Sequence, residues 1–381
     1  MTRPLHSLAP EEIVGLCAAQ FGVDVVFEES LPGLAAINVL LRAELGQPDR
    51  PGGSDHPEQT DAVEQAGDPG QPPARFVLKA EYPSPTMTPA HFDWVCRTQE
   101  QARAAGLPIA AQVPARTPFT DPSTGESSGA LALVDVDGTP AMVRLHAFLP
   151  GQEAAAARSE WYPGLAGALA ARMTNALADA PAEPAPVVHP WSFVATGANV
   201  LSLCDRINAL EAAGQVPQEF GTPLSADLAL VRAHAQEFEQ SVRPALTGLP
   251  HQVVHQDLND SNILLSGGRV SGVIDFNDSA TAPRLAELAI AAASAMIRQS
   301  DPAAALTAAH RAYQAEAAGT SAALDPAESA LVEHAALTRL ALIACTWTAR
   351  AITAPPEHPH ARTGRARMRS TWPVLRAVLG S

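Results

Sequence analysis

Apolar and polar positions follow a strand-like pattern in the first part of the chain and a helical pattern in the rest. Alternating or short apolar runs predict β-strands at 23–29, 37–45, 75–81, 109–113, 130–136 and 142–149. Helical periodicity with end signals predicts helices at 9–20, 88–105, 161–178, 224–242, 283–298, 302–317, 326–351 and 361–378. Strands therefore dominate up to about residue 149, and helices follow.

One segment interrupts this pattern. Residues 46–75 are rich in Pro, Gly and acidic residues and hold almost no apolar residue. Such a composition cannot bury enough surface to order itself, so a flexible surface insertion between two strands is predicted, without a catalytic role.

The stretch 251–278 carries the strongest chemical signal. It predicts a strand, a polar loop, a second strand, a tight turn and a third strand. The parts in order are Val253-Val254, the loop from His255 to Asn262, the apolar run Ile263–Leu265, the turn signal Ser266-Gly267-Gly268, and the run Val270–Phe276. Because the turn folds the third strand back, Asp275 is expected to return to the level of the loop that holds Asp257 and Asn262.

Two carboxylates and an amide oxygen at one place suit a small divalent cation. Mg²⁺ prefers oxygen ligands and takes few of them from protein when phosphate is also present. Asn262 and Asp275 are the candidate metal ligands. Asp257 is the candidate general base, which accepts the proton of an attacking hydroxyl group.

Two simpler interpretations compete with this one. Asp, Asn and Ser are common in ordinary turns, because their side chains bond to nearby backbone. A calcium loop also begins with this pattern, but it needs Gly where Asn262 stands and Glu where Gly268 stands. The order H-x-D-x-x-x-x-N, apolar strand, and a second strand ending in I-D-F favours the phosphoryl-transfer interpretation.

The segments H-Q-D-L-N-D-S-N-I-L-L and G-V-I-D-F-N-D-S resemble those of the aminoglycoside phosphotransferase-like kinases, with the hydroxylysine kinase branch as the best match. The resemblance continues through A-P-R-L-A-E-L-A-I-A, and weaker matches cover most of the chain. One departure lies inside the motif, since Asn277 stands where the family usually has Gly. Asn tolerates positive φ better than most residues, so the metal ligand Asp275 is not put in doubt.

The resemblance implies a two-lobed, protein-kinase-like α+β fold. Residues 1–148 would form an antiparallel nucleotide-binding lobe, and residues 149–381 a mainly helical lobe with the catalytic loop and the acceptor site. It implies a Mg²⁺-dependent kinase that moves the γ-phosphoryl group of ATP or GTP to a hydroxyl of a small amine-bearing metabolite. An antibiotic phosphotransferase and a catalytically silent nucleotide-binding pseudokinase remain the alternatives.

The resemblance also implies nucleotide-binding positions in the first lobe. Lys79, near the end of the third strand, would hold the α- and β-phosphates. Asp93 would pair with that lysine, with Glu100 as the other candidate. Gly33 would belong to the hairpin over the phosphates. Backbone groups near His146 and Phe148 would contact the nucleotide base, with the His146 side chain itself structural.

Composition and charge limit the kinds of partner and the compartment that we expect for this protein. The net charge of −15 argues against nucleic acid. Neither a signal peptide nor an apolar stretch of membrane length is expected, and four scattered cysteines without C-x-x-C spacing fit a reducing compartment, so a cytoplasmic protein is predicted. The sequence leaves open the acceptor, the choice between ATP and GTP, and the oligomeric state.

Overall fold

The chain forms two compact units. The computed structural model describes residues 3–31, 36–44, 74–156, 159–185, 189–216, 224–355 and 358–380. Unit 1 comprises Met1–Gly151, Glu183–Val187 and Val270–Asn277, and unit 2 comprises Gln152–Ala182, Val188–Arg269 and Asp278–Ser381. The segment Val270–Asn277 therefore comes from the middle of the unit 2 sequence and completes unit 1. Most of the predicted insertion, residues 46–73, lies outside the described residues.

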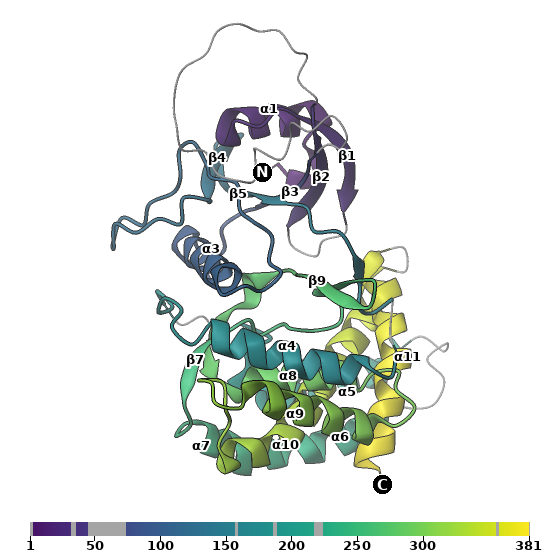
Figure 1. The fold of residues 1–381 in the computed structure, drawn as a ribbon. Helices are drawn as coiled ribbons and strands as arrows, with labels where there is room; N and C mark the ends of the chain where they lie inside the picture. Colours follow the sequence, from purple (N-terminus) through teal and green to yellow (C-terminus); the bar gives the residue numbers. More distant parts are fainter. Residues whose placement is uncertain are drawn as a thin grey trace, which may run out of the picture. The chain divides into compact units, whose positions relative to one another are not determined.

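Unit 1 is built on a five-stranded sheet in the order β1-β2-β3-β5-β4 (Figure 1). The strands are β1 (Val25–Leu31), β2 (Ile37–Ala43), β3 (Arg75–Glu81), β4 (Ala132–Val136) and β5 (Thr139–Ala147). All neighbours are antiparallel. Asp137 and Gly138 join β4 to β5 with φ of 51° and 82°, the conformation that an Asp-Gly hairpin requires. The predicted strand at 109–113 is reduced to isolated bridges at Ile109 and Gln112.

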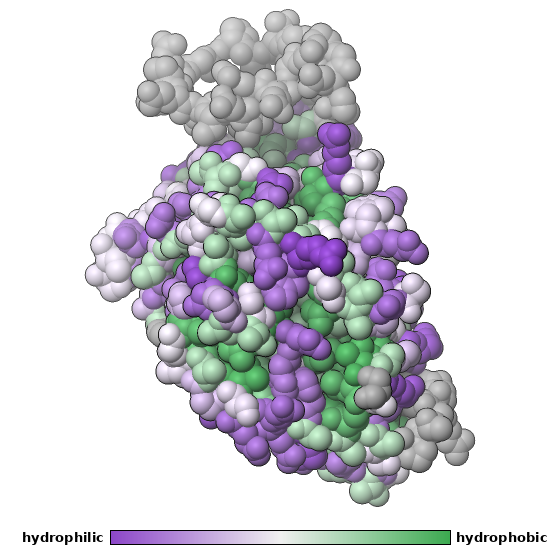
Figure 2. All heavy atoms as spheres, turned by 60° about the horizontal axis from the view of Figure 1, so that its bottom comes forward, coloured by the Kyte–Doolittle hydropathy of each residue, from purple (hydrophilic) through white to green (hydrophobic). Residues whose placement is uncertain are grey.

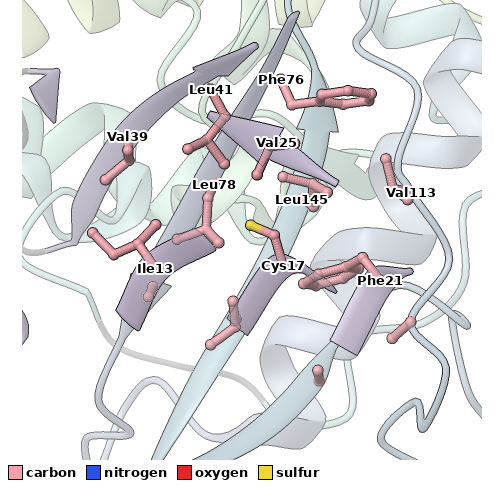
Figure 3. Packing of buried hydrophobic residues seen from close by; sticks show 14 of the residues in the cluster. Ile13, Cys17, Phe21, Val25, Val39, Leu41, Phe76, Leu78, Val113 and Leu145 are labelled. Carbon is pink, nitrogen blue, oxygen red and sulfur yellow. The ribbon is translucent and has the colours of Figure 1, made fainter. Parts of the chain in front are cut away.

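Two helices cover opposite faces of this sheet. One face is covered by α1 (Pro10–Phe21), and the apolar side chains between them include Ile13, Cys17, Phe21, Val25, Val39, Leu41, Phe76, Leu78 and Leu145 (Figure 3). The other helix, α3 (Pro89–Ala104), packs Phe92 against Met142. Met142 and its neighbour Val143 belong to different clusters because successive side chains of a strand point to opposite faces. Thr88 caps α3, accepting from the His91 amide at 3.2 Å.

Unit 2 is mainly helical. Its helices are α4 (Tyr162–Ala176), α5 (Thr196–Ala212), α6 (Ser225–Glu237), the π-helical turn η5 (Phe238–Val242), α7 (Arg243–Leu246), α8 (Leu285–Ala295), α9 (Pro302–Ala317), α10 (Pro326–Thr353) and α11 (Pro359–Leu379). The antiparallel sheet in the first part and the helices in the second confirm the predicted α+β class. Helix α5 was not predicted, although its buried residues Val200, Cys204 and Ile207 follow a helical spacing.

The helices of unit 2 pack around α8 and α10. Helix α8 is buried along its whole length, and α10 contacts α5, α8 and α11. The expectation that no stretch reaches membrane length was wrong for α10, which is long and apolar enough by length and composition. Within the protein, 61% of its most apolar window is buried, as in the core helix of a globular unit. On the face shown in Figure 2, hydrophobic and hydrophilic residues are interspersed.

Helices α4 and α9 touch through a glycine. A Cβ atom at Gly167 of α4 would overlap the backbone carbonyl of Ala309 in α9. Gly164, one turn earlier on α4, has open space at the same position. The absence of a side chain at Gly167 therefore sets how closely the two helices approach.

The motif stretch forms the elements that its pattern predicts. It contains β7 (His251–Val254), β8 (Ile263–Ser266), β9 (Arg269–Val273), the 3₁₀ turn η6 (Phe276–Asp278) and β10 (Ala280–Pro283). Gly267 and Gly268 separate β8 from β9 with φ of 57° and 76°. In unit 2, β7 pairs with β10, and β8 pairs with β6 (Gln152–Glu153).

Candidate active site

The loop after β7 holds Asp257 in a defined orientation. Asn262 donates from Nδ2 to Asp257 Oδ2 at 2.8 Å and to the Asp257 carbonyl at 2.9 Å. Asn259 Nδ2 donates to Oδ1 at 2.9 Å, and Arg339 Nη2 lies 3.4 Å from the same oxygen. The Asp257 side chain remains 25% exposed, so it is oriented and still accessible.

Buried groups of unit 2 fix the backbone that precedes Asp257. Gln256 has a φ of 63°, and its side chain accepts from the Phe193 amide at 3.2 Å and donates to the Asp278 carbonyl at 2.8 Å. Glu287 of α8 accepts from the His255 amide at 2.7 Å. Burial raises the pKa of the Glu287 carboxyl to about 8, against the opposing effect of the backbone amides.

His255 supports the loop that holds Asp257. Its Nδ1 accepts from the Asp257 amide at 3.2 Å, and the residue is fully buried. Arg284, three residues before Glu287, bonds Glu328 of α10 at 2.6 Å and 2.8 Å. Glu287 instead ties α8 to the loop through its bond to the His255 amide.

The C-terminal helix anchors the second half of the loop. Arg367 of α11 donates to Asp260 Oδ1 at 3.0 Å and to Ser261 Oγ at 2.5 Å. The Asp260 amide donates to Ser294 Oγ of α8 at 2.9 Å. Asp260 is fully buried, so its charge serves this ion pair rather than a solvated loop face.

In unit 1, Lys79 meets Asp275. Lys79 Nζ lies 3.3 Å from Asp275 Oδ1, and the two side chains are 18% and 44% exposed. Asp275 has a φ of 66°, a left-handed conformation that a non-glycine residue adopts at a cost. The structure thus brings together two of the predicted site residues in unit 1, and Asp257 with Asn262 in unit 2.

A buried ion pair lies beside them. Arg144 donates to Glu81 at 2.6 Å and to Asn277 Oδ1 at 3.1 Å, and its guanidinium lies 4.5 Å from the Phe92 ring centroid. Burial raises the pKa of the Glu81 carboxyl, while Arg144 and Lys79 act in the opposite direction. Asn277 therefore bonds Arg144 in this protein. Its φ in η6 is not positive, so the position does not require Gly.

The predicted pairing of Asp93 with Lys79 was wrong. Asp93 accepts from the Ser128 amide at 2.7 Å and lies 3.3 Å from Arg97. Glu100, the other candidate, pairs with Arg103 on the helix surface at 2.7 Å. The acid that contacts Lys79 is Asp275, almost 200 residues later in the chain. The position of an acid within α3 could not indicate that contact.

The predicted base-contact segment is engaged inside unit 1. The Leu145 carbonyl accepts from Val113 at 2.8 Å, and the Phe148 amide donates to Arg75 at 2.8 Å. His146 is buried with Nδ1 3.3 Å from Gln99, and burial lowers its pKa well below the ordinary value, in agreement with a structural side chain. The Phe148 ring lies under Arg75. Gly33 lies outside the described residues.

Two functional neighbours were not predicted. Arg339 of α10 reaches Asp257 from 82 residues away, and no local pattern signals such a contact. Arg144 carried a signal, since it is a charged residue within the buried run Met142–Leu145. A charge at a core position of a strand indicates a buried partner, here Glu81.

Asn262 of unit 2 and Asp275 of unit 1 each offer an oxygen atom of a kind that binds divalent cations. Both hydrogens of Asn262 Nδ2 point to Asp257, so Oδ1 is the amide atom that remains for a metal. Asp275 presents a partly exposed carboxylate. Oxygen ligands of these two kinds suit Mg²⁺. The helical unit carries an oriented carboxylate, and the antiparallel sheet of the other unit carries a lysine. Each unit by itself thus has parts of a kinase-like small-molecule phosphotransferase.

Comparison with known proteins agrees with this class. Residues 72–341 match the phosphotransferase enzyme family (APH), and the chain belongs to this family. Hydroxylysine kinase of Mus musculus is 25% identical over 246 residues, which cover 60% of this chain and 59% of that protein. The chain thus spans less than two thirds of this curated relative.

Solved structures share the fold. A microcompartment-associated aminopropanol kinase aligns with a TM-score of 0.58 and 12% identity over 97% of both chains. An amicoumacin kinase in complex with AMP-PNP and Ca²⁺ aligns with a TM-score of 0.56 and 14% identity, covering 97% of this chain and 94% of that one. At these identities the comparison shows the fold alone.

Proposed function

We propose that the chain transfers the γ-phosphoryl group of ATP or GTP to a hydroxyl of a small amine-bearing metabolite, with hydroxylysine as the first acceptor to test. The orientation of the Asp257 carboxylate is the observation that carries the proposal. The 25% identity to a hydroxylysine kinase supports the choice of acceptor. The cytoplasm is the proposed compartment, because the four cysteines are buried and free, as suits a reducing environment.

Each residue has a separate role in this proposal. Asp257 accepts the proton of the acceptor hydroxyl as the new oxygen–phosphorus bond forms. Asn259 and Asn262 hold the carboxylate so that little reorientation is needed. Lys79 binds phosphate oxygens, and Asn262 and Asp275 would hold Mg²⁺, which neutralises charge on the phosphates when bound.

The role of Asp257 is tested by substitution. Asp257→Ala and the isosteric Asp257→Asn are expected to lower kcat by about 10²–10⁴-fold, because the hydroxyl loses its proton acceptor, while nucleotide Kd stays unchanged. Asp179→Ala, an exposed acid of unit 2, is the matched control. Nucleoside diphosphate release and nucleotide titration give the two readings. Undiminished turnover in both Asp257 variants would remove this residue from the mechanism.

Asp275→Ala tests the metal role separately. The variant is expected to lose both turnover and the dependence of nucleotide affinity on Mg²⁺, because the lost carboxylate is a metal ligand in the proposal. Nucleotide Kd measured over a Mg²⁺ series is the reading. A variant whose Mg²⁺ dependence equals that of the wild type would contradict the assignment.

The acceptor class is tested by a panel. Hydroxylysine, homoserine, choline and aminoglycosides are compared by nucleoside diphosphate release with ATP and with GTP. Turnover confined to aminoglycosides would favour antibiotic modification. Nucleotide binding without turnover of any acceptor would favour a pseudokinase.

A further inference from the structure

Helices α5 and α10 of unit 2 enclose a small cavity. Its volume is about 300 Å³, at the lower end of the range for small-molecule sites. The lining residues are Pro190, Trp191, Asn199, Ser202, Leu203, Arg206, Leu342, Thr346, Ala349, Arg350 and Thr353. Among the residues that the structure describes around this cavity, the only charged side chains are the two arginines. A cationic cavity in a chain of net charge −15 is not the result of a generally basic surface.

Arg350 lines this cavity and carries an unsatisfied polar group. Its Nη1 is buried and has no hydrogen-bond partner within the part of the chain that the structure describes. The guanidinium lies 4.8 Å from the Trp347 ring centroid and 5.8 Å from that of Trp191. Burial lowers the pKa of Arg350, and no carboxylate among the described residues acts in the opposite direction. Contact with two rings leaves the guanidinium without a neutralising partner among the described residues, and such a group favours an anionic ligand.

The remaining lining residues indicate the chemistry of that acceptor. Arg206 is an exposed second guanidinium, and Ser202 and Thr346 add hydroxyl groups. Asn199 donates from Nδ2 to the Pro190 carbonyl at 2.9 Å. Planar guanidinium groups match the two oxygens of a carboxylate. The Trp191 ring and two leucines suit a short aliphatic chain attached to it.

Trp191 also connects the cavity to the candidate base. Arg339 Nη1 donates to the Trp191 carbonyl at 2.6 Å, and its guanidinium lies 5.2 Å from the ring centroid. Arg339 Nη2 reaches Asp257 Oδ1 at 3.4 Å. Trp191 is therefore in contact with an arginine of the cavity and with the arginine that touches Asp257.

We propose that this cavity binds the carboxylate of a small molecule, with Arg350 as its principal donor. If the ligand is the phosphoryl acceptor, the inference rests on the proposed function and narrows the acceptor to a hydroxy amino acid rather than an amino alcohol. If the ligand is a separate molecule, the same site regulates the protein.

Binding is measured by calorimetry on the full chain. Hydroxylysine and homoserine carry a carboxylate, whereas 1-amino-2-propanol and choline do not. Arg350→Met is expected to raise Kd for the first pair about tenfold or more, since a charge-assisted bond is lost, and to leave the second pair unchanged. Arg311→Met, an exposed arginine of α9, is the matched control and should bind as the wild type.

Two results would overturn the proposal. One is the absence of binding of either carboxylate ligand to the wild type, and the other is an equal loss for both ligand pairs in Arg350→Met. Arg350→Lys, which keeps the charge but not the planar fork, is expected to weaken the carboxylate ligands selectively even if the Met variant is unfolded. An equal effect of Arg350→Lys on both pairs would also overturn it.

Analysis of the reaction product shows whether the bound carboxylate ligand is the phosphoryl acceptor or a separate molecule. Phosphorylation of a bound carboxylate ligand identifies it as the acceptor, and binding without phosphorylation identifies a separate ligand. Turnover of 1-amino-2-propanol without carboxylate binding would leave the phosphotransferase proposal standing while this one fails.

Discussion

Two residues of the motif have a left-handed backbone conformation that few non-glycine residues adopt. Gln256 and Asp275 have φ of 63° and 66°, each at a cost of about 1–3 kcal/mol. At Gln256 the surrounding structure offsets this cost, since three different elements bond its side chain and carbonyl. The result is an Asp257 whose position is settled before any substrate binds, which is what positional catalysis requires.

Glu287 makes the stability of unit 2 depend on pH. Its pKa rises from 4.5 to about 8 on folding, so the folded state binds a proton that the unfolded state releases between these values. The contribution to stability is therefore complete below pH 4.5 and falls as pH rises towards 8, by at most roughly 1.4 kcal/mol per pH unit. Glu287→Gln keeps an acceptor for the His255 amide and is expected to lose this slope.

Urea unfolding of both proteins between pH 5 and 8 measures the difference. Glu316→Gln, an exposed position of α9, is the control and should retain the wild-type slope. Parallel stability curves for the wild type and Glu287→Gln would mean that the buried carboxyl does not take up a proton in this range.

Packing of α4 on α9 depends on one glycine. A methyl group at Gly167 would overlap the Ala309 backbone, which cannot move as a flexible side chain does. Gly167→Ala is therefore expected to destabilise the protein by about 2 kcal/mol or more, despite the better helix propensity of Ala. Gly164→Ala on the same helix is expected to be neutral or stabilising by up to about 1 kcal/mol. Thermal unfolding compares the two, and equal Tm values would contradict the close approach of these helices.

Elements were predictable wherever the sequence carried local signals. The cap at Thr88, the Asp137-Gly138 turn and the apolar run of β8 each depend on nearby residues, and the structure has all three. Contacts between distant segments could not be derived in this way. Lys79 pairs with Asp275 and not with Asp93, and Arg339 of α10 pairs with Asp257. Such partners depend on tertiary packing rather than on spacing along the sequence.

The two units are interleaved along the sequence, because unit 1 includes a segment from the middle of the unit 2 sequence. Three contacts of the segment Val270–Asn277 belong to unit 1, namely the Val273 amide with Pro108 at 2.9 Å, Asp275 with Lys79 at 3.3 Å, and Asn277 with Arg144 at 3.1 Å. A fragment ending at residue 151 contains most of unit 1 but lacks these partners.

Hydrogen exchange of that fragment tests the arrangement. Amides of β3 and β5 are expected to exchange faster in a fragment of residues 1–151 than in the full chain, since each lost contact contributes about 1 kcal/mol. A synthetic peptide of residues 268–279 should slow the exchange, and the same peptide with Asp275→Ala and Asn277→Ala should do so less. Identical exchange in the fragment and the full chain would show that unit 1 is complete without the segment.

This interleaving also has a consequence during synthesis. The ribosome makes residues 1–151 first, yet the last piece of unit 1 leaves the exit tunnel only after more than a hundred further residues have been translated. Until residue 277 emerges, Lys79 lacks Asp275 and Arg144 lacks Asn277, although Arg144 can already pair with Glu81. Nascent-chain stability is thus expected to rise in a step at that length rather than gradually.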